Sequence, residues 1–225
     1  MKVSKMLIVV LCGSLMMVTI SNRGQTENQS DNLLNRQVKR ANLQDVKVGQ
    51  AAINALIDAG SPGGIATVSG CNEDVTHTFT PRDSSLLGVL DSIVSTDPHY
   101  KWELMDNLVN VIPSNGLPPF FAVRISKFDI PGAETPNEAL FQLLAIPELR
   151  QAQLNLGRHA IQGGVRPFCP QGCSPEKTKK ISVNLKGVTV REALNAIARA
   201  DGSAVWRFSQ WECGGQRTFS LEFSK

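Results

Sequence analysis

Apolar residues recur at helical spacing in two segments of the chain that lie 104 residues apart. In residues 85–94, and again in residues 189–198, apolar side chains occupy the second, fifth, sixth, ninth and tenth positions. This spacing places them along one face of an α-helix. Ser85 and Thr189 stand where an N-cap is expected, and Thr189 with Glu192 has the spacing of a capping box. The pattern predicts two equivalent amphipathic helices.

The residues on either side of both helices alternate between apolar and polar, which is the period of a β-strand with one buried face. One such strand precedes each helix and two follow it, the first of these carrying Trp102 or Trp206. The Asp-Asn pair at 106–107 predicts a hairpin turn, and Cys-Gly-Gly at 213–215 predicts a longer one. The predicted strands are 75–79, 102–104 and 108–112 in the first half of the chain and 181–185, 206–208 and 218–223 in the second.

Each half also begins with a strand and a helix of its own. Thr135, Pro136 and Glu138 give the second half a cap, a proline at the first helical position and an acidic first turn. The order β-α-β-β-α-β-β in each half predicts an α+β fold of two tandem modules, at residues 44–115 and 116–225. The additional elements are strand 46–48, helix 51–59 and strand 65–68, then strand 120–130 and a helix over 136–156 that Pro147 interrupts.

The second half resembles the short N-terminal domain of secretins and TonB-dependent receptors, the STN domain, best over residues 184–198. The first half is similar but more diverged, through residues 79–91, 100–102 and 109–113. The residues that carry the resemblance in the second half are Ile181, Val183, Leu185, Gly187, Val188, Val190, Ala193, Leu194 and Ile197.

This resemblance implies a small α+β domain on the periplasmic side of the outer membrane, which docks partner proteins beside a secretin pore or a TonB-dependent receptor. The sequence departs from the family pattern because it carries cysteines and a tandem copy, and no barrel or plug segment follows residue 225. We therefore expect only the docking role to carry over.

The N-terminus has the pattern of a secretory signal. Lys2 and Lys5 precede an uncharged, mostly apolar run over residues 6–20, which is shorter than the roughly 20 residues of a membrane-spanning helix. Cleavage is expected after Ser21, followed by a polar linker at residues 22–43. A periplasmic or secreted location follows, with an uncleaved anchor as the alternative.

Four cysteines lie beyond this signal: Cys71, Cys169, Cys173 and Cys213. An even number in an exported chain indicates disulfides, and four cysteines allow three pairings. A zinc site is the competing interpretation, because Cys169 and Cys173 have ligand-like spacing, but no second close pair of ligands completes it. Free thiols are the third possibility.

Candidate chemistry is sparse. The three histidines, His77, His99 and His159, belong to no recognised catalytic or metal-binding motif, so no catalytic residue, metal or cofactor is predicted. Net charge is +3 and the basic residues are scattered, which does not indicate a nucleic-acid partner. Trp211, expected on a hairpin loop beside Cys213, is the candidate interaction anchor.

Together these features predict an exported, non-catalytic adaptor of the bacterial cell envelope. Its expected partner is an envelope protein such as a secretin or a component of the TonB system. Two alternatives remain open: an exported hydrolase with an unrecognised site, and a structural component of the envelope.

Overall fold

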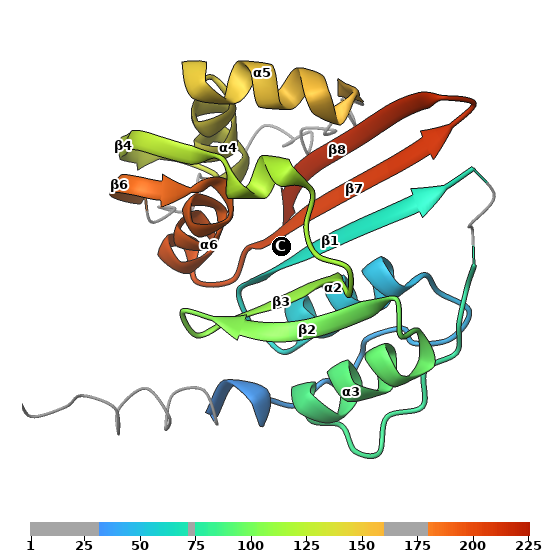
Figure 1. Ribbon diagram of the computed structural model, residues 1–225. Coiled ribbons are helices and arrows are strands. Elements are labelled where there is room, and N and C mark those ends of the chain that lie inside the picture. The colour runs from blue at the N-terminus through green and yellow to red at the C-terminus, as the bar shows by residue number, and fades with distance from the viewer. Residues whose placement is uncertain (1–31, 72–74, 160–179) are drawn as a thin grey trace, which may run out of the picture.

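The computed structural model describes residues 32–71, 75–159 and 180–225, and its helices and strands form a mixed α/β structure, consistent with the predicted α+β class (Figure 1). Within these ranges, no helix combines the length and apolar character needed to cross a membrane. The elements are α2 (Val48–Asp58), β1 (Gly63–Gly70), α3 (Leu86–Thr96), β2 (Tyr100–Met105), β3 (Leu108–Pro113), η1 (Pro119–Ala122), β4 (Arg124–Ala133), α4 (Pro136–Leu144), α5 (Pro147–Leu156), β5 (Arg158–His159), β6 (Ile181–Thr189), α6 (Val190–Asp201), β7 (Val205–Cys213) and β8 (Gln216–Ser224).

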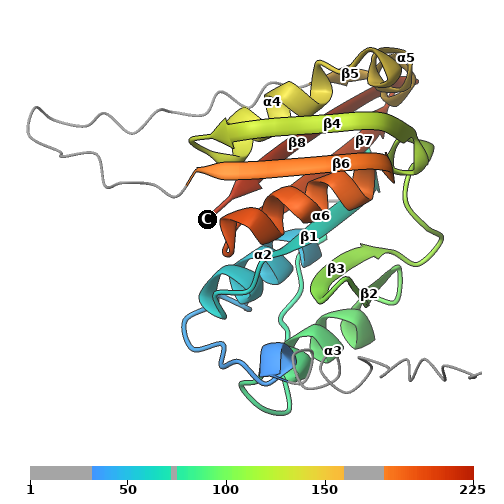
Figure 2. The ribbon, with the colours of Figure 1, turned by 90° about the vertical axis from the view of Figure 1, so that its left-hand side faces the viewer.

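The strands form one six-stranded sheet and one two-stranded sheet. The larger sheet has the order β2-β3-β1-β7-β8-β5, and β4 pairs with β6 in the smaller one. β1 runs parallel to both of its neighbours, β3 and β7, whereas β2–β3 and β7–β8 are antiparallel hairpins. Figure 2 shows β4 and β6 as a two-stranded ribbon beside α6. Strands from the two halves of the chain therefore share one sheet, joined where β1 meets β7.

The core consists of two apolar clusters, one on each face of the six-stranded sheet. Ile65 of β1 packs in the cluster that includes α2 and α3, and its neighbour Ala66 packs in the cluster that includes α4 and α6. Successive residues of a strand face opposite ways, so β1 contributes to both clusters. β3 is buried at all six positions, which explains its nearly continuous apolar sequence.

The contact between β1 and β7 requires glycine. Gly64 lies opposite Trp206, and a Cβ placed on Gly64 would fall 1.8 Å from Cε2 of the indole. A Cβ on Gly63 would fall 2.5 Å from the carbonyl oxygen of Val109 on β3. Because these glycines have no side chains, β1 fits between its two neighbours and the Trp206 ring is fully buried.

A disulfide closes the far end of the same contact. The last residue pair of β1 and β7 is Gly70 opposite Glu212, and the next residues, Cys71 and Cys213, are bonded with a Cα–Cα distance of 4.6 Å. The expectation of a disulfide is thus confirmed for these two cysteines. Cys169 and Cys173 lie outside the described residues.

A polar network crosses from β2 and β3 to α6 and β7. The fully buried amides of Asn110 and Asn195 each donate to the other's oxygen, at 3.4 and 3.3 Å. Arg191 Nε donates to Asn110 Oδ1 at 2.9 Å, while its guanidinium also pairs with Glu103. Trp206 Nε1 donates to Asn195 Oδ1 at 2.8 Å. Both buried amides are thereby satisfied, as polar groups in a core must be.

The helix signals in the sequence are confirmed. Ser85 accepts a hydrogen bond from the backbone of Gly88 at the start of α3, and Thr189 with Glu192 forms a complete capping box on α6. Thr135 caps α4 as expected. Pro147 separates α4 from α5, because it cannot donate the backbone hydrogen bond that a continuous helix needs.

Several strand predictions were wrong. Residues 46–48 and 75–79 form only a single bridge between Val46 and His77, because α2 already begins at Val48. Phe120 and Phe121 lie in the 3₁₀ turn η1, which two prolines initiate, and β4 starts only at Arg124.

The turn between β7 and β8 is shorter than predicted. It consists of Gly214 and Gly215, both with positive φ, and has the same length as the turn at Asp106 and Asn107. Positive φ at both central residues is typical of the two-residue hairpin turn that matches strand twist. The second hairpin extends further because its strands have nine residues each rather than six.

Replacing Gly64 tests the close approach of β1 and β7. Gly64→Ala should lower the free energy of unfolding by about 3 kcal/mol, because the new methyl group overlaps the Trp206 ring. Gly132→Ala is the matched control, since its Cβ meets only the flexible side chain of Lys180, at 3.3 Å. Urea denaturation measures both, and equal stability of the two variants would contradict the close approach.

The disulfide can be tested by removal. A Cys71→Ser, Cys213→Ser double variant should lose about 3–5 kcal/mol of unfolding free energy, because the bond closes a loop with a sequence separation of 142. A non-reducing proteolytic digest should contain a linked peptide pair with Cys71 and Cys213. Free alkylation of both thiols without reductant would exclude the bond.

Candidate functional site

The terminal strand β2 forms the candidate site. β2 lies at the edge of the six-stranded sheet, and among the described strands it pairs only with β3. Trp102 packs at the margin of the cluster with α2 and α3, and Leu104 has 36% of its surface exposed. Lys101 is exposed. The outer side of an edge strand presents backbone N–H and C=O groups to which a strand of another protein can form hydrogen bonds. We call the outer side of β2 the docking edge.

The tryptophan of this edge has a counterpart in the second half. Trp102 Nε1 donates to Asp91 Oδ1 of α3 at 3.0 Å, and Trp206 Nε1 donates to Asn195 Oδ1 of α6 at 2.8 Å. Both tryptophans and both acceptors are separated by 104 residues in the sequence. The two bonds therefore occupy equivalent places, each linking a strand to the helix that precedes it.

The two tryptophans differ in what covers them. Trp206 is fully buried, with Gly64 of β1 against its ring. Trp102 is only partly buried, because β2 has no described strand on its outer side. Two tryptophans at equivalent strand positions thus differ in burial, which is complete for Trp206 and partial for Trp102.

Side-chain contacts hold β2 in place on both faces of the sheet. Glu103, between Trp102 and Leu104, pairs with Arg191 of α6, whose side chain is 15% exposed. Successive residues of β2 are thus bound from opposite faces, by α3 through Trp102 and by α6 through Glu103. A strand fixed on both faces loses little conformational freedom when a partner binds to its edge.

Two of the three histidines meet at one carboxylate. His99 Nδ1 lies 2.9 Å from Asp97 Oδ1, and His77 Nε2 lies 3.6 Å from Asp97 Oδ2. Asp97 ends α3, and its side chain also accepts the backbone N–H of His99 at 3.1 Å. The spacing of Asp97 and His99 is visible in the sequence, whereas the approach of His77 arises from its bridge to Val46. A carboxylate can orient both imidazoles and pair with them when they are protonated.

The third histidine is exposed, but it stacks on an aromatic ring. His159 on β5 stacks on Phe219, with ring centroids 4.8 Å apart, and burial lowers the pKa of its imidazole. A lowered pKa favours the neutral ring against the apolar cluster. His159 lies on a different strand from His77 and His99 and does not join them.

Trp211 does not lie on a loop. It belongs to β7, opposite Thr218 of β8 and Ser69 of β1, and its side chain is partly buried. The earlier placement was wrong because the hairpin continues for two residues beyond Trp211 before its turn begins. Its role as an interaction anchor stays a prediction.

Within the described ranges, no cluster of three histidine, cysteine or acidic side chains could hold a metal ion.

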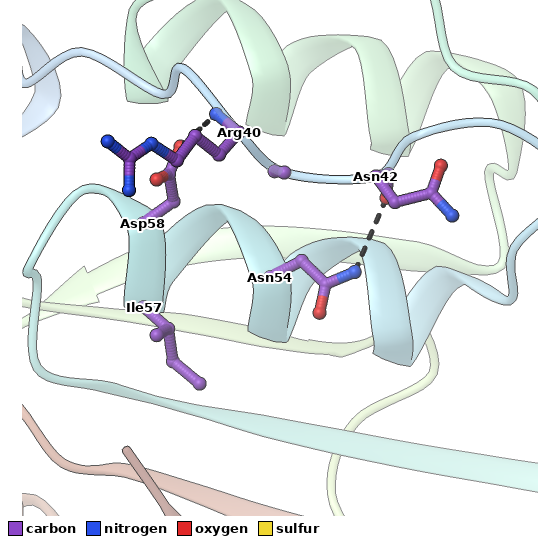
Figure 3. Close-up of a pocket in the computed structure, with 6 residues that line it drawn as sticks. Arg40, Asn42, Asn54, Ile57 and Asp58 are labelled. Atoms are coloured by element: carbon purple, nitrogen blue, oxygen red, sulfur yellow. Dashed lines mark hydrogen bonds between the residues drawn. The ribbon is translucent and has the colours of Figure 1, made fainter.

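A hollow of about 310 Å³ lies between α2 and the segment that precedes it (Figure 3). The residues lining this hollow are Arg40, Ala41, Asn42, Asn54, Ile57 and Asp58.

The polar groups of the hollow fasten the preceding segment to α2. Asp58 Oδ2 accepts the backbone N–H groups of Lys39 and Arg40 at 2.5 and 2.6 Å. The bond from Arg40 is the main cause that holds the pKa of Asp58 below its ordinary value. Asn54 donates to the carbonyl of Asn42 at 3.4 Å, as Figure 3 shows. The polar side chains of the hollow therefore serve to hold residues 39–42 against α2.

Comparisons of the chain with protein-family models, with curated proteins and with solved structures found no match. The similarity to the STN family therefore stays a prediction from the sequence. The case for β2 as a docking edge depends on the geometry of this chain alone.

Replacing Asp58 tests its attachment of the segment. A carboxyl whose pKa falls on folding stabilises the fold above the unfolded pKa, near 3.8, and loses that effect as pH falls through the folded pKa. Asp58→Asn should cost about 1 kcal/mol near neutral pH, and this cost should shrink as pH falls through the folded pKa of Asp58. In NMR spectra the Arg40 amide proton should titrate with the Asp58 carboxyl in the wild type and stay constant in the variant. An Arg40 signal that does not change between pH 6 and 2 in the wild type would refute this role.

Proposed function

We propose that this chain is an exported, non-catalytic binding protein of the bacterial cell envelope, built from two copies of one α+β module. It docks a partner protein at the outer side of β2, the strand at the end of the six-stranded sheet, and docking is the role that the resemblance to the STN family implies. The observation that carries the proposal is the contrast between two equivalent edges: β1 covers the outer edge of β7, whereas β2 lies at the end of the sheet.

The duplication is supported by matching topology. In the first half β1 runs parallel to β3, the second strand of its hairpin; in the second half β5 runs parallel to β8 in the same way. The bridge between Val46 and His77 corresponds to the pairing of β4 with β6. The equivalent bonds of Trp102 and Trp206 to α3 and α6 extend the match to side chains.

The joint between the halves supports docking by strand addition. β1, the last strand in the sheet order of the first half, pairs along eight positions with β7, the first strand of the second half. Two unlike edges meet in such a head-to-tail joint, so each half keeps one edge that the joint does not use. On the first half that edge is β2.

Export is supported by sequence and structure together. The apolar run at residues 6–20 follows two lysines. The bond between Cys71 and Cys213 belongs to an oxidising compartment, where such bonds form and persist. A periplasmic or secreted location accommodates both features.

A second candidate function is hydrolysis at the Asp97 cluster. The observation that favours it is the pair of imidazoles, His77 and His99, on one carboxylate. A hydrolase would lose its activity in His77→Ala and His99→Ala variants, and it would keep it in His159→Ala.

The docking edge can be tested by site-specific photo-crosslinking in the cells that produce the protein. A crosslinking residue in place of Lys101 on β2 should give a specific adduct with one partner protein. The same residue in place of Arg150, exposed on α5, should give none. In a separate measurement on the same cells, the intact mass of the recovered protein should correspond to a chain that begins at Asn22, as cleavage after Ser21 requires. Adducts from neither position, together with hydrolytic activity that depends on His77 and His99, would replace the proposal by the second candidate.

A further inference from the structure

The pairing of β1 with β7 inside the molecule indicates what kind of strand fits beside the docking edge of β2. β7 is the equivalent of β2, and its outer edge is occupied by β1 in parallel orientation. Trp206 and Phe208 on β7 correspond to Trp102 and Leu104 on β2, again 104 residues apart. β1 therefore shows which chemistry fits beside this pair of side chains.

The strand β1 presents small residues to β7 at alternate positions. Gly64 lies opposite Trp206, and Ala66 lies opposite Phe208. Alternate residues share one face of a strand, so both small residues lie on the face of the two aromatic rings. No side chain larger than hydrogen fits at the first position, because the indole occupies the place of its Cβ.

Trp102 and Leu104 on β2 are less buried than their counterparts on β7. Trp206 and Phe208 are fully buried beside β1. Trp102 and Leu104 are partly buried and 36% exposed, respectively. An added strand with the pattern of β1 would cover both side chains and pair with the outer side of β2 at Trp102 and Leu104, where no described strand lies.

We propose, building on the docking function above, that β2 binds an extended segment of a partner protein that runs parallel to it. The segment carries glycine opposite Trp102 and a second small residue two positions later, opposite Leu104. Glycine at the first position lets the peptide backbone lie against the Trp102 ring. The small second residue leaves space for Leu104. Specificity arises because any larger residue at the first position collides with the indole.

The probe is a synthetic peptide with the β1 sequence, Gly-Gly-Ile-Ala-Thr-Val-Ser-Gly, added to the full chain. The matched control peptide has valine at the positions that correspond to Gly64 and Ala66. NMR spectroscopy of the indole N–H groups reports binding residue by residue, since the Trp102 signal should shift and the Trp206 signal should stay. We expect the control peptide to bind at least about tenfold more weakly.

Variants of the edge complete the test. Leu104→Arg should abolish the shift of the Trp102 signal, and Arg150→Ala on α5 should leave it unchanged. Equal binding of the two peptides, or a shift of Trp206 in place of Trp102, would overturn the inference. If the peptide fails while crosslinking from Lys101 still yields a partner, the glycine rule is wrong and the docking function stands. Concentration-dependent dimers that Leu104→Arg disrupts would identify a second copy of this chain as the occupant and would also overturn the inference.

Discussion

The whole molecule depends on how closely β1 approaches its neighbours. This strand of eight residues pairs with β3 on one side and β7 on the other, and its faces contribute to both apolar clusters. Gly63 and Gly64 make the approach possible, since each would otherwise place a Cβ within 2.5 Å of a neighbouring strand. Burial of the Trp206 ring follows from that contact, and removing such a ring from a core typically costs about 3–5 kcal/mol.

Two further features fix the same contact in register. The disulfide between Cys71 and Cys213 holds the end of β1 to the end of β7. The amides of Asn110 and Asn195 hold β3 to α6 inside the core, where an unpaired polar group would be costly. Each amide can satisfy the other only in one alignment of the two halves. The apolar clusters provide most of the burial, and these directional contacts select the arrangement.

The proposed function follows from the same geometry. A joint between two unlike edges covers β7 and leaves β2 at the end of the sheet. β2 is nevertheless held from both faces, by Asp91 through Trp102 and by Arg191 through Glu103. An edge that is ordered before it binds suits strand addition, because the partner alone has to lose conformational freedom. The Asp97 cluster lies at the start of the same strand, where the backbone N–H of Tyr100 donates to the carbonyl of Asp97 at 3.2 Å.

The sequence by itself determined the features that depend on local chain chemistry. The caps at Ser85, Thr135 and Thr189, the break at Pro147 and the hairpin at 106–107 were all predictable, because hydrophobic period, capping and turn preferences act over a few residues. The spacing of 104 residues between the tryptophans was also visible, although its meaning for Trp102 was not.

Only the tertiary structure decided which edges pair, which cysteine bonds to Cys71 and where His77 lies relative to Asp97. The strand predicted at residues 46–48, and the start of the strand predicted at 120–130, were wrong for the same reason: a strand exists only where a neighbour pairs with it, and that neighbour is distant in sequence. The difference between a covered Trp206 and a half-covered Trp102 is likewise a property of the sheet order. Two residues with the same local sequence pattern acquire different roles because one has β1 beside it and the other has the edge of the sheet.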